Sequence, residues 1–119
     1  MSTLFDFEKL DVYKLALSFA TQVAQATENA PRGYWSLVDQ LRRASTSVAL
    51  NIAEGAGRYP KGEKKQFYSI AKGSVYECVP LISLFDELKI IEAKTALEWK
   101  AIIQRIAQML TKLSQAIKL

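Results

Sequence analysis

Hydrophobic residues recur with the period of an α-helix in four separate stretches of the chain. The clearest stretch is 94–117, where large hydrophobic residues follow alternating steps of four and three, as in the core-facing positions of a helical bundle. They are Trp99, Ile103, Ile106, Leu110, Leu113 and Ile117. Similar spacing predicts helices over about 5–29, 34–56 and 63–89. Short connections containing proline or glycine separate the first three.

No stretch shows the alternating pattern of a β-strand, so the fold class is all-α. Four helices of similar length joined by short turns predict an antiparallel up-down-up-down four-helix bundle. A length of 119 residues fits a single domain, 1–119. Some large side chains fall outside any one stripe, which indicates a subunit interface and hence a homo-oligomer. These are Phe19, Trp35, Tyr68 and Tyr76.

The segment 40–58 reads QLRRASTSVALNIAEGAGR and is unusually rich in small residues. Small side chains let neighbouring helices approach closely, so we expect this helix to be buried on more than one side. Gly55 and Gly57 bracket its predicted end. Asn51 and Glu54 lie one turn apart and share a face. We interpret them as a hydrogen-bonded pair that fixes the helix end against a neighbour, the alternative being an acid–amide pair with a chemical role.

This segment, followed by KKQFYSIAKGSVYE, resembles the 23S ribosomal RNA intervening-sequence protein family. The opening FEKLDVYKLALSFA resembles the start of the same family, so the resemblance covers about residues 5–91. It implies a four-helix bundle whose structural motif is NIAEG-x-GR, with Asn51, Glu54, Gly55 and Gly57. It also implies a homo-oligomer in the form of a ring of five subunits. The family is related to accessory subunits of reverse transcriptases in diversity-generating retroelements.

Composition argues against an enzyme. The chain has no histidine, which removes the commonest general base and metal ligand, and no cofactor or metal site is expected. Its one cysteine, Cys78, falls on the inward face of the third predicted helix, and we expect an inert buried thiol. The chain has neither a signal-peptide pattern nor an apolar run long enough to span a bilayer. The prediction is a cytoplasmic protein without a membrane partner.

The net charge of +4 is unevenly distributed. Residues 1–31 carry −2, residues 32–73 carry +5 and residues 74–119 carry +1. A local basic excess favours nucleic acid as partner, and the family resemblance favours RNA. The predicted phosphate contacts are Arg42, Arg43, Arg58, Lys61, Lys64 and Lys65. Tyr59 is the predicted base-stacking partner.

Two alternatives stay open for these residues. Arg42 or Arg43 could instead form an intersubunit salt bridge with Glu54 or Asp39. The basic patch as a whole would also suit an acidic protein partner. In that case the protein is a scaffold or an accessory subunit, for example of a reverse transcriptase, without a direct role in nucleic-acid binding.

Overall fold

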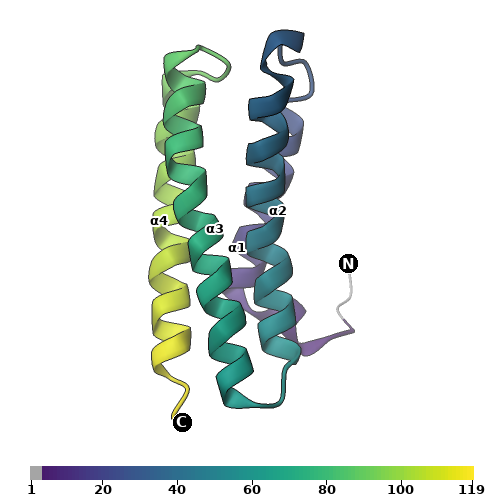
Figure 1. Cartoon of the computed structure of the whole chain (residues 1–119), viewed down its shortest axis with the longest axis vertical. Coiled ribbons are helices and arrows are strands. Elements are labelled where there is room, and N and C mark those ends of the chain that lie inside the picture. Colours follow the sequence, from purple (N-terminus) through teal and green to yellow (C-terminus); the bar gives the residue numbers. More distant parts are fainter. Residues whose placement is uncertain (1–3) are drawn as a thin grey trace.

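The computed structural model describes residues 4–119, so the first three residues of the predicted domain lie outside the described part. Four long helices dominate it, with two short 3₁₀ helices before the first and the second of them (Figure 1). In chain order the elements are η1 (Asp6–Lys9), α1 (Asp11–Ala26), η2 (Arg32–Tyr34), α2 (Trp35–Gly57), α3 (Lys61–Glu87) and α4 (Ala93–Gln115).

The four helices pack side by side in an elongated body of 45 × 29 × 23 Å. Within residues 4–119, α1 lies against α2 and α4, and α3 lies against α2 and α4. The turns α1–α2 and α3–α4 lie at the upper end in Figure 1, and the turn α2–α3 lies at the lower end. The contact between α2 and α3 is the most extensive and that between α1 and α4 the least.

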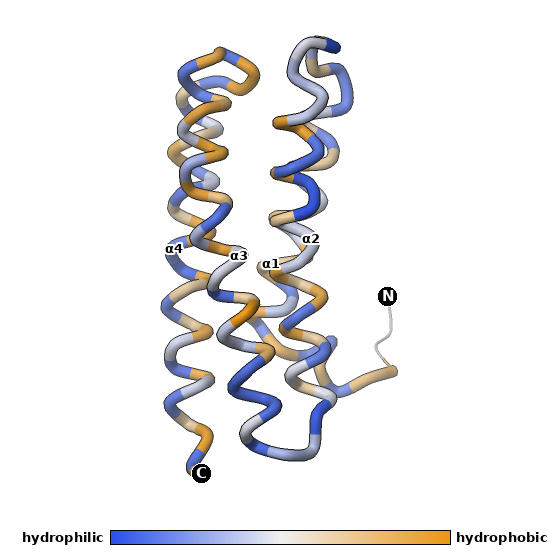
Figure 2. The backbone as a smooth tube through the Cα atoms, viewed as in Figure 1, coloured by the Kyte–Doolittle hydropathy of each residue, from blue (hydrophilic) through white to orange (hydrophobic). Residues whose placement is uncertain are grey.

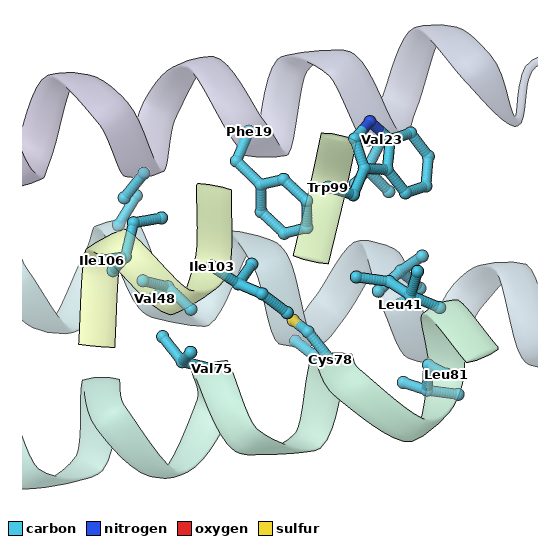
Figure 3. Packing of buried hydrophobic residues seen from close by; sticks show 14 of the residues in the cluster. Phe19, Val23, Leu41, Val48, Val75, Cys78, Leu81, Trp99, Ile103 and Ile106 are labelled. Atoms are coloured by element: carbon cyan, nitrogen blue, oxygen red, sulfur yellow. The ribbon is translucent and has the colours of Figure 1, made fainter. Parts of the chain in front are cut away.

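Hydrophobic residues recur along each of the four long helices (Figure 2), and those that are buried meet in one core (Figure 3). Trp99, Ile103, Ile106 and Leu110 of α4 are buried, while Leu113 and Ile117 pack at its edge. Phe19 of α1 meets the Trp99 ring edge-to-face, with 5.8 Å between ring centroids. Burying a side chain of this size stabilises the fold by about 2 kcal/mol or more.

The beginning of the first helix differs from the predicted range of 5–29. Leu10 has an extended backbone, with φ −68° and ψ 127°, and separates η1 from α1. Phe7 lies against Tyr13 edge-to-face at 5.1 Å and stacks on Phe5 at 5.9 Å between centroids, which draws η1 across the end of the bundle. α1 ends at Ala26, because the next residues form a turn. The other three helices lie within two residues of their predicted bounds.

Two of the four large side chains assigned to a subunit interface are in fact core residues. Phe19 is fully buried against Trp99, and Tyr68 is buried beside Gly55 of α2. A helix that contacts two neighbouring helices buries more side chains than one hydrophobic stripe contains, so the sequence pattern underestimated the number of core residues. Trp35 and Tyr76 do lie exposed on the surface. None of the helices described is long and apolar enough to cross a membrane.

Candidate nucleic-acid interface

Five of the predicted RNA contacts gather at the turn between α2 and α3. We call this set the basic turn, and it comprises Arg58, Tyr59, Lys61, Lys64 and Lys65. α2 ends because Arg58 takes an extended backbone, and Pro60, with a φ of −67°, is the residue directly before α3. Tyr59 is 97% exposed at the tip of the turn. An aromatic ring in this position is free to stack on an unpaired base.

Arg58 is held in place by its neighbours. Its guanidinium lies 3.0 Å from a carboxylate oxygen of Glu54 and 3.9 Å from one of Glu63. It also covers the Phe67 ring at 4.8 Å from the centroid. These contacts compensate part of its charge and fix its direction, so Arg58 contributes less positive potential than the sequence alone indicates.

Lys64 has a structural role that the sequence did not reveal. Its Nζ donates hydrogen bonds to the carbonyl oxygens of Gly55, at 3.1 Å, and Ala56, at 2.8 Å. These carbonyls belong to the last turn of α2, where a cation is favoured by the helix dipole. Lys64 belongs to the first turn of α3, but its side chain caps the C-terminal end of α2.

Arg42 and Arg43 lie elsewhere on the molecule. At a rise of 1.5 Å per residue, Arg42 is roughly 24 Å along α2 from Arg58. Arg42 donates to Thr27 Oγ1 at 2.9 Å and to the carbonyl of Ala24 at 3.3 Å, so it ties the end of α1 to α2. Arg43 forms an exposed pair with Asp39 of its own helix at 2.9 Å. The predicted contacts therefore form two separate groups.

Lys61 and Lys65 are the lysines of the basic turn that remain available. The salt bridges found within residues 4–119 involve neither of them, and neither takes part in a side-chain hydrogen bond there. Lys61 is exposed and Lys65 is half-buried. Between residues 54 and 65, four cations face two carboxylates, which leaves a net charge of +2.

Lys112 and Lys118, which the sequence analysis did not select, lie at the same end of the molecule as the basic turn. The final turn of α4 and the residues after it lie at this end (Figure 1). Charge totals along the sequence miss them because about fifty residues separate them from the turn. The order of the helices in the predicted bundle was the signal that could have indicated them.

The motif residues do not form the predicted Asn51–Glu54 pair. Asn51 donates instead to the carbonyl oxygen and the hydroxyl of Ser47, at 2.8 and 3.0 Å. Glu54 binds Arg58. The Ser47 hydroxyl lies 2.9 Å from the hydroxyl of Ser74 on α3. The amide therefore supports a polar link between α2 and α3, and the carboxylate supports the turn.

The two glycines of the motif have different environments. Gly55 lies inside α2, before its end, and an added Cβ would come within 2.7 Å of Tyr68 Cε1. Gly57 is the last residue of α2, and an added Cβ there would meet nothing within 4 Å. Gly55 therefore permits the close approach of α3, whereas Gly57 marks the end of the helix.

Cys78 lies in the core between α2, α3 and α4 (Figure 3). Burial, and to a smaller extent the neighbouring Glu77 carboxylate, together raise the pKa of its thiol to about 12. At neutral pH the group is a protonated thiol and a poor nucleophile. Among the described residues, no three cysteine, aspartate or glutamate side chains gather at a potential metal site.

Comparison with known proteins identifies relatives of this fold. A crystal structure of a protein of unknown function from the S23 ribosomal protein family of Bacteroides thetaiotaomicron superposes with a TM-score of 0.80 at 18% sequence identity. The alignment covers 88% of this chain and 99% of that one, and it shows a shared fold. No curated protein sequence matches. Residues 8–112 match the family described as 23S rRNA-intervening sequence protein, and the chain belongs to this family.

Proposed function

We propose that this protein is a non-catalytic homo-oligomer that binds RNA through the basic turn. The observation that carries the proposal is the pair Lys61 and Lys65, without a carboxylate partner in the described chain, beside the exposed ring of Tyr59. Ammonium groups bind phosphates of any sequence, and an aromatic face stacks on any base. This combination favours a flexible single strand over a rigid duplex.

The contacts that each basic residue makes within the bundle determine the role that we propose for it in RNA binding. Lys61, Lys65 and Tyr59 contact the strand directly, and Arg58 shares its guanidinium between Glu54 and a phosphate. Lys64 and Arg42 already serve backbone carbonyls and Thr27, so we assign them a supporting role. Arg43, whose pair with Asp39 is exposed, extends the surface along α2.

Assembly multiplies this weak site. One turn with a net charge of +2 gives a modest contribution to affinity. A ring of subunits, for which we propose five copies from the family resemblance, repeats the turn on one surface. Linked sites bind a long strand far more tightly than one site does, provided that the strand reaches several of them.

The test is RNA binding by the purified protein across a salt series. Fluorescence anisotropy of a labelled single-stranded RNA gives the slope of log affinity against log salt, which is about −0.7 for each phosphate neutralised. The double change Lys61→Gln with Lys65→Gln should reduce this slope and weaken binding, and Tyr59→Ala should weaken binding with little change in slope. Arg32→Gln with Lys94→Gln is the matched control, because both residues are exposed and lie near the turns at the opposite end of the bundle.

Failure of the wild-type protein to bind RNA at low salt would overturn the RNA assignment. Equal losses in the Lys61/Lys65 variant and in the control would overturn the assignment of the basic turn. The first result favours the second candidate, a scaffold or accessory subunit whose basic turn binds an acidic protein, since lysine pairs with carboxylates as well as phosphates. A pull-down that keeps its partner after nuclease treatment would identify that case.

A further inference from the structure

A long apolar groove lies between α3 and α4. It has a volume of about 650 Å³ and lies on the face formed by these two helices. Val75 and Ala101 line its apolar interior, and Tyr76 and Leu97 are 60% and 71% exposed. Lys72 and Lys100 add positive charge, and no carboxylate lines the groove in the described chain. The groove therefore fits a segment that is apolar and acidic.

The same chain exposes such a segment. We call Leu4–Lys9 the arm, and it comprises Leu4, Phe5 and η1. Leu4 is 87% and Phe5 61% exposed, although both are large apolar residues. Asp6 is exposed beside them, Glu8 is half-buried and Lys9 is exposed, so the arm carries a net charge of −1. Figure 1 shows this part of the chain extending sideways from the bundle.

The arm cannot reach the groove of its own copy. Phe7 anchors it against Tyr13 and lines a hollow together with residues at the end of α2. Contacts of η1 within the described residues are to α1 and α2, on the other side of the bundle from the groove. From Phe7 to Leu4 an extended chain spans about 10 Å. The bundle is 23 Å across at its narrowest, so the groove that the arm fills has to belong to another copy.

We propose that the arm of one copy docks into the α3–α4 groove of a second copy. Leu4 and Phe5 occupy the apolar interior, and Asp6 and Glu8 face Lys72 and Lys100. Each copy carries an arm and a groove on different faces, and we assign a head-to-tail contact, which leaves a free arm and a free groove at the ends of any open assembly. Such contacts repeat until the assembly closes into a ring. This inference rests on the homo-oligomer proposed above and names its contact.

Two surface variants and their mixture test the contact. The arm variant is Leu4→Ser with Phe5→Ser, and the groove variant is Tyr76→Glu with Leu97→Glu. All four positions are exposed, so the fold should persist, which circular dichroism and thermal unfolding verify. Light scattering after size exclusion should show the wild-type oligomer and monomers of each variant. An equimolar mixture should give a dimer, because only the intact arm of one variant fits the intact groove of the other.

Leu50→Ser on α2 is the control, since it removes an equally exposed apolar side chain outside the arm and the groove, and it should keep the wild-type mass. If the wild-type protein is a monomer, both the homo-oligomer and this contact are wrong. If the wild type is an oligomer and the arm variant keeps its mass, the arm contact is wrong and the oligomer stands. If the two variants are monomers and their mixture forms no dimer, the head-to-tail pairing is wrong.

Discussion

Replacing Gly55 by alanine tests the close packing of α2 against α3. In an exposed helix interior this change stabilises the protein by about 1 kcal/mol, because glycine loses more backbone entropy on folding. At Gly55 the new methyl group would lie 2.7 and 2.9 Å from two ring carbons of Tyr68 and 3.1 Å from Phe67 Cβ. Tyr68 is itself buried, so its ring has little room to move away.

The expected magnitude follows from these opposing effects. Overfilling a packed core costs about 1–3 kcal/mol, which exceeds the propensity gain. We therefore expect Gly55→Ala to lower the unfolding free energy by up to about 2 kcal/mol. Gly73→Ala is the matched control, because Gly73 lies inside α3 and an added Cβ meets nothing within 4 Å. The control should raise the unfolding free energy by about 1 kcal/mol.

Urea unfolding at a fixed protein concentration measures both changes, because the stability of an oligomer depends on concentration. Thermal unfolding should show shifts of opposite sign, about 4 °C for each kcal/mol in a chain of this size. A Gly55→Ala variant as stable as the Gly73→Ala variant would refute the packing argument. In a Tyr68→Ala background most of the loss caused by Gly55→Ala should disappear, since the colliding ring is absent and only the 3.1 Å contact with Phe67 Cβ remains.

Two further predictions concern groups whose roles emerged from the structure. Lys64→Met should lower the unfolding free energy measured in urea by about 1 kcal/mol, because it removes two ammonium-to-carbonyl hydrogen bonds at a partly exposed helix end. The control Lys65→Met should change the unfolding free energy by less than about 0.5 kcal/mol. Equal effects of the two changes would contradict the capping role of Lys64. Above pH 9 the Cys78 thiol loses its proton in the unfolded chain, whereas the folded chain keeps this proton because the pKa there is about 12. The unfolding free energy should therefore fall between these pH values by up to about 1.4 kcal/mol per pH unit. Cys78→Ala should show a shallower fall over the same pH range, and an unchanged slope would mean that the thiol is not protected by burial.

Much of the fold could be predicted from hydrophobic spacing. The α4 stripe led by Trp99 and Ile103 appears as predicted in the core, because burial along a helix follows its period. The break at Leu10 could not be predicted in this way. It depends on the aromatic contact between Phe7 and Tyr13, which draws η1 away from the α1 axis. Local spacing carries no information about such a contact.

The cations of the candidate site could be predicted from the sequence, but the contacts that each of them makes within the bundle could not. The sequence places the cations, yet it does not show which of them the fold already occupies. Lys64 binds carbonyls across a turn, and Arg42 binds Thr27 at the end of the preceding helix. A charge count treats these side chains as equivalent to Lys61 and Lys65. Only the three-dimensional contacts separate cations that support the bundle from cations that are available to a partner.

The edge-to-face contact between Phe19 and Trp99 joins the first long helix to the last, and we expect a contact of such large sequence separation to form late in folding. α2 and α3 are joined by only three residues, so their pairing requires closure of a short loop. The seam between α1 and α4 joins segments near opposite ends of the sequence and requires almost the whole chain to be arranged first. We therefore expect the backbone amides of α2 and α3 to become protected from hydrogen exchange early in refolding. Those of α1 should follow when Phe19 meets Trp99, and earlier protection of α1 would contradict this order.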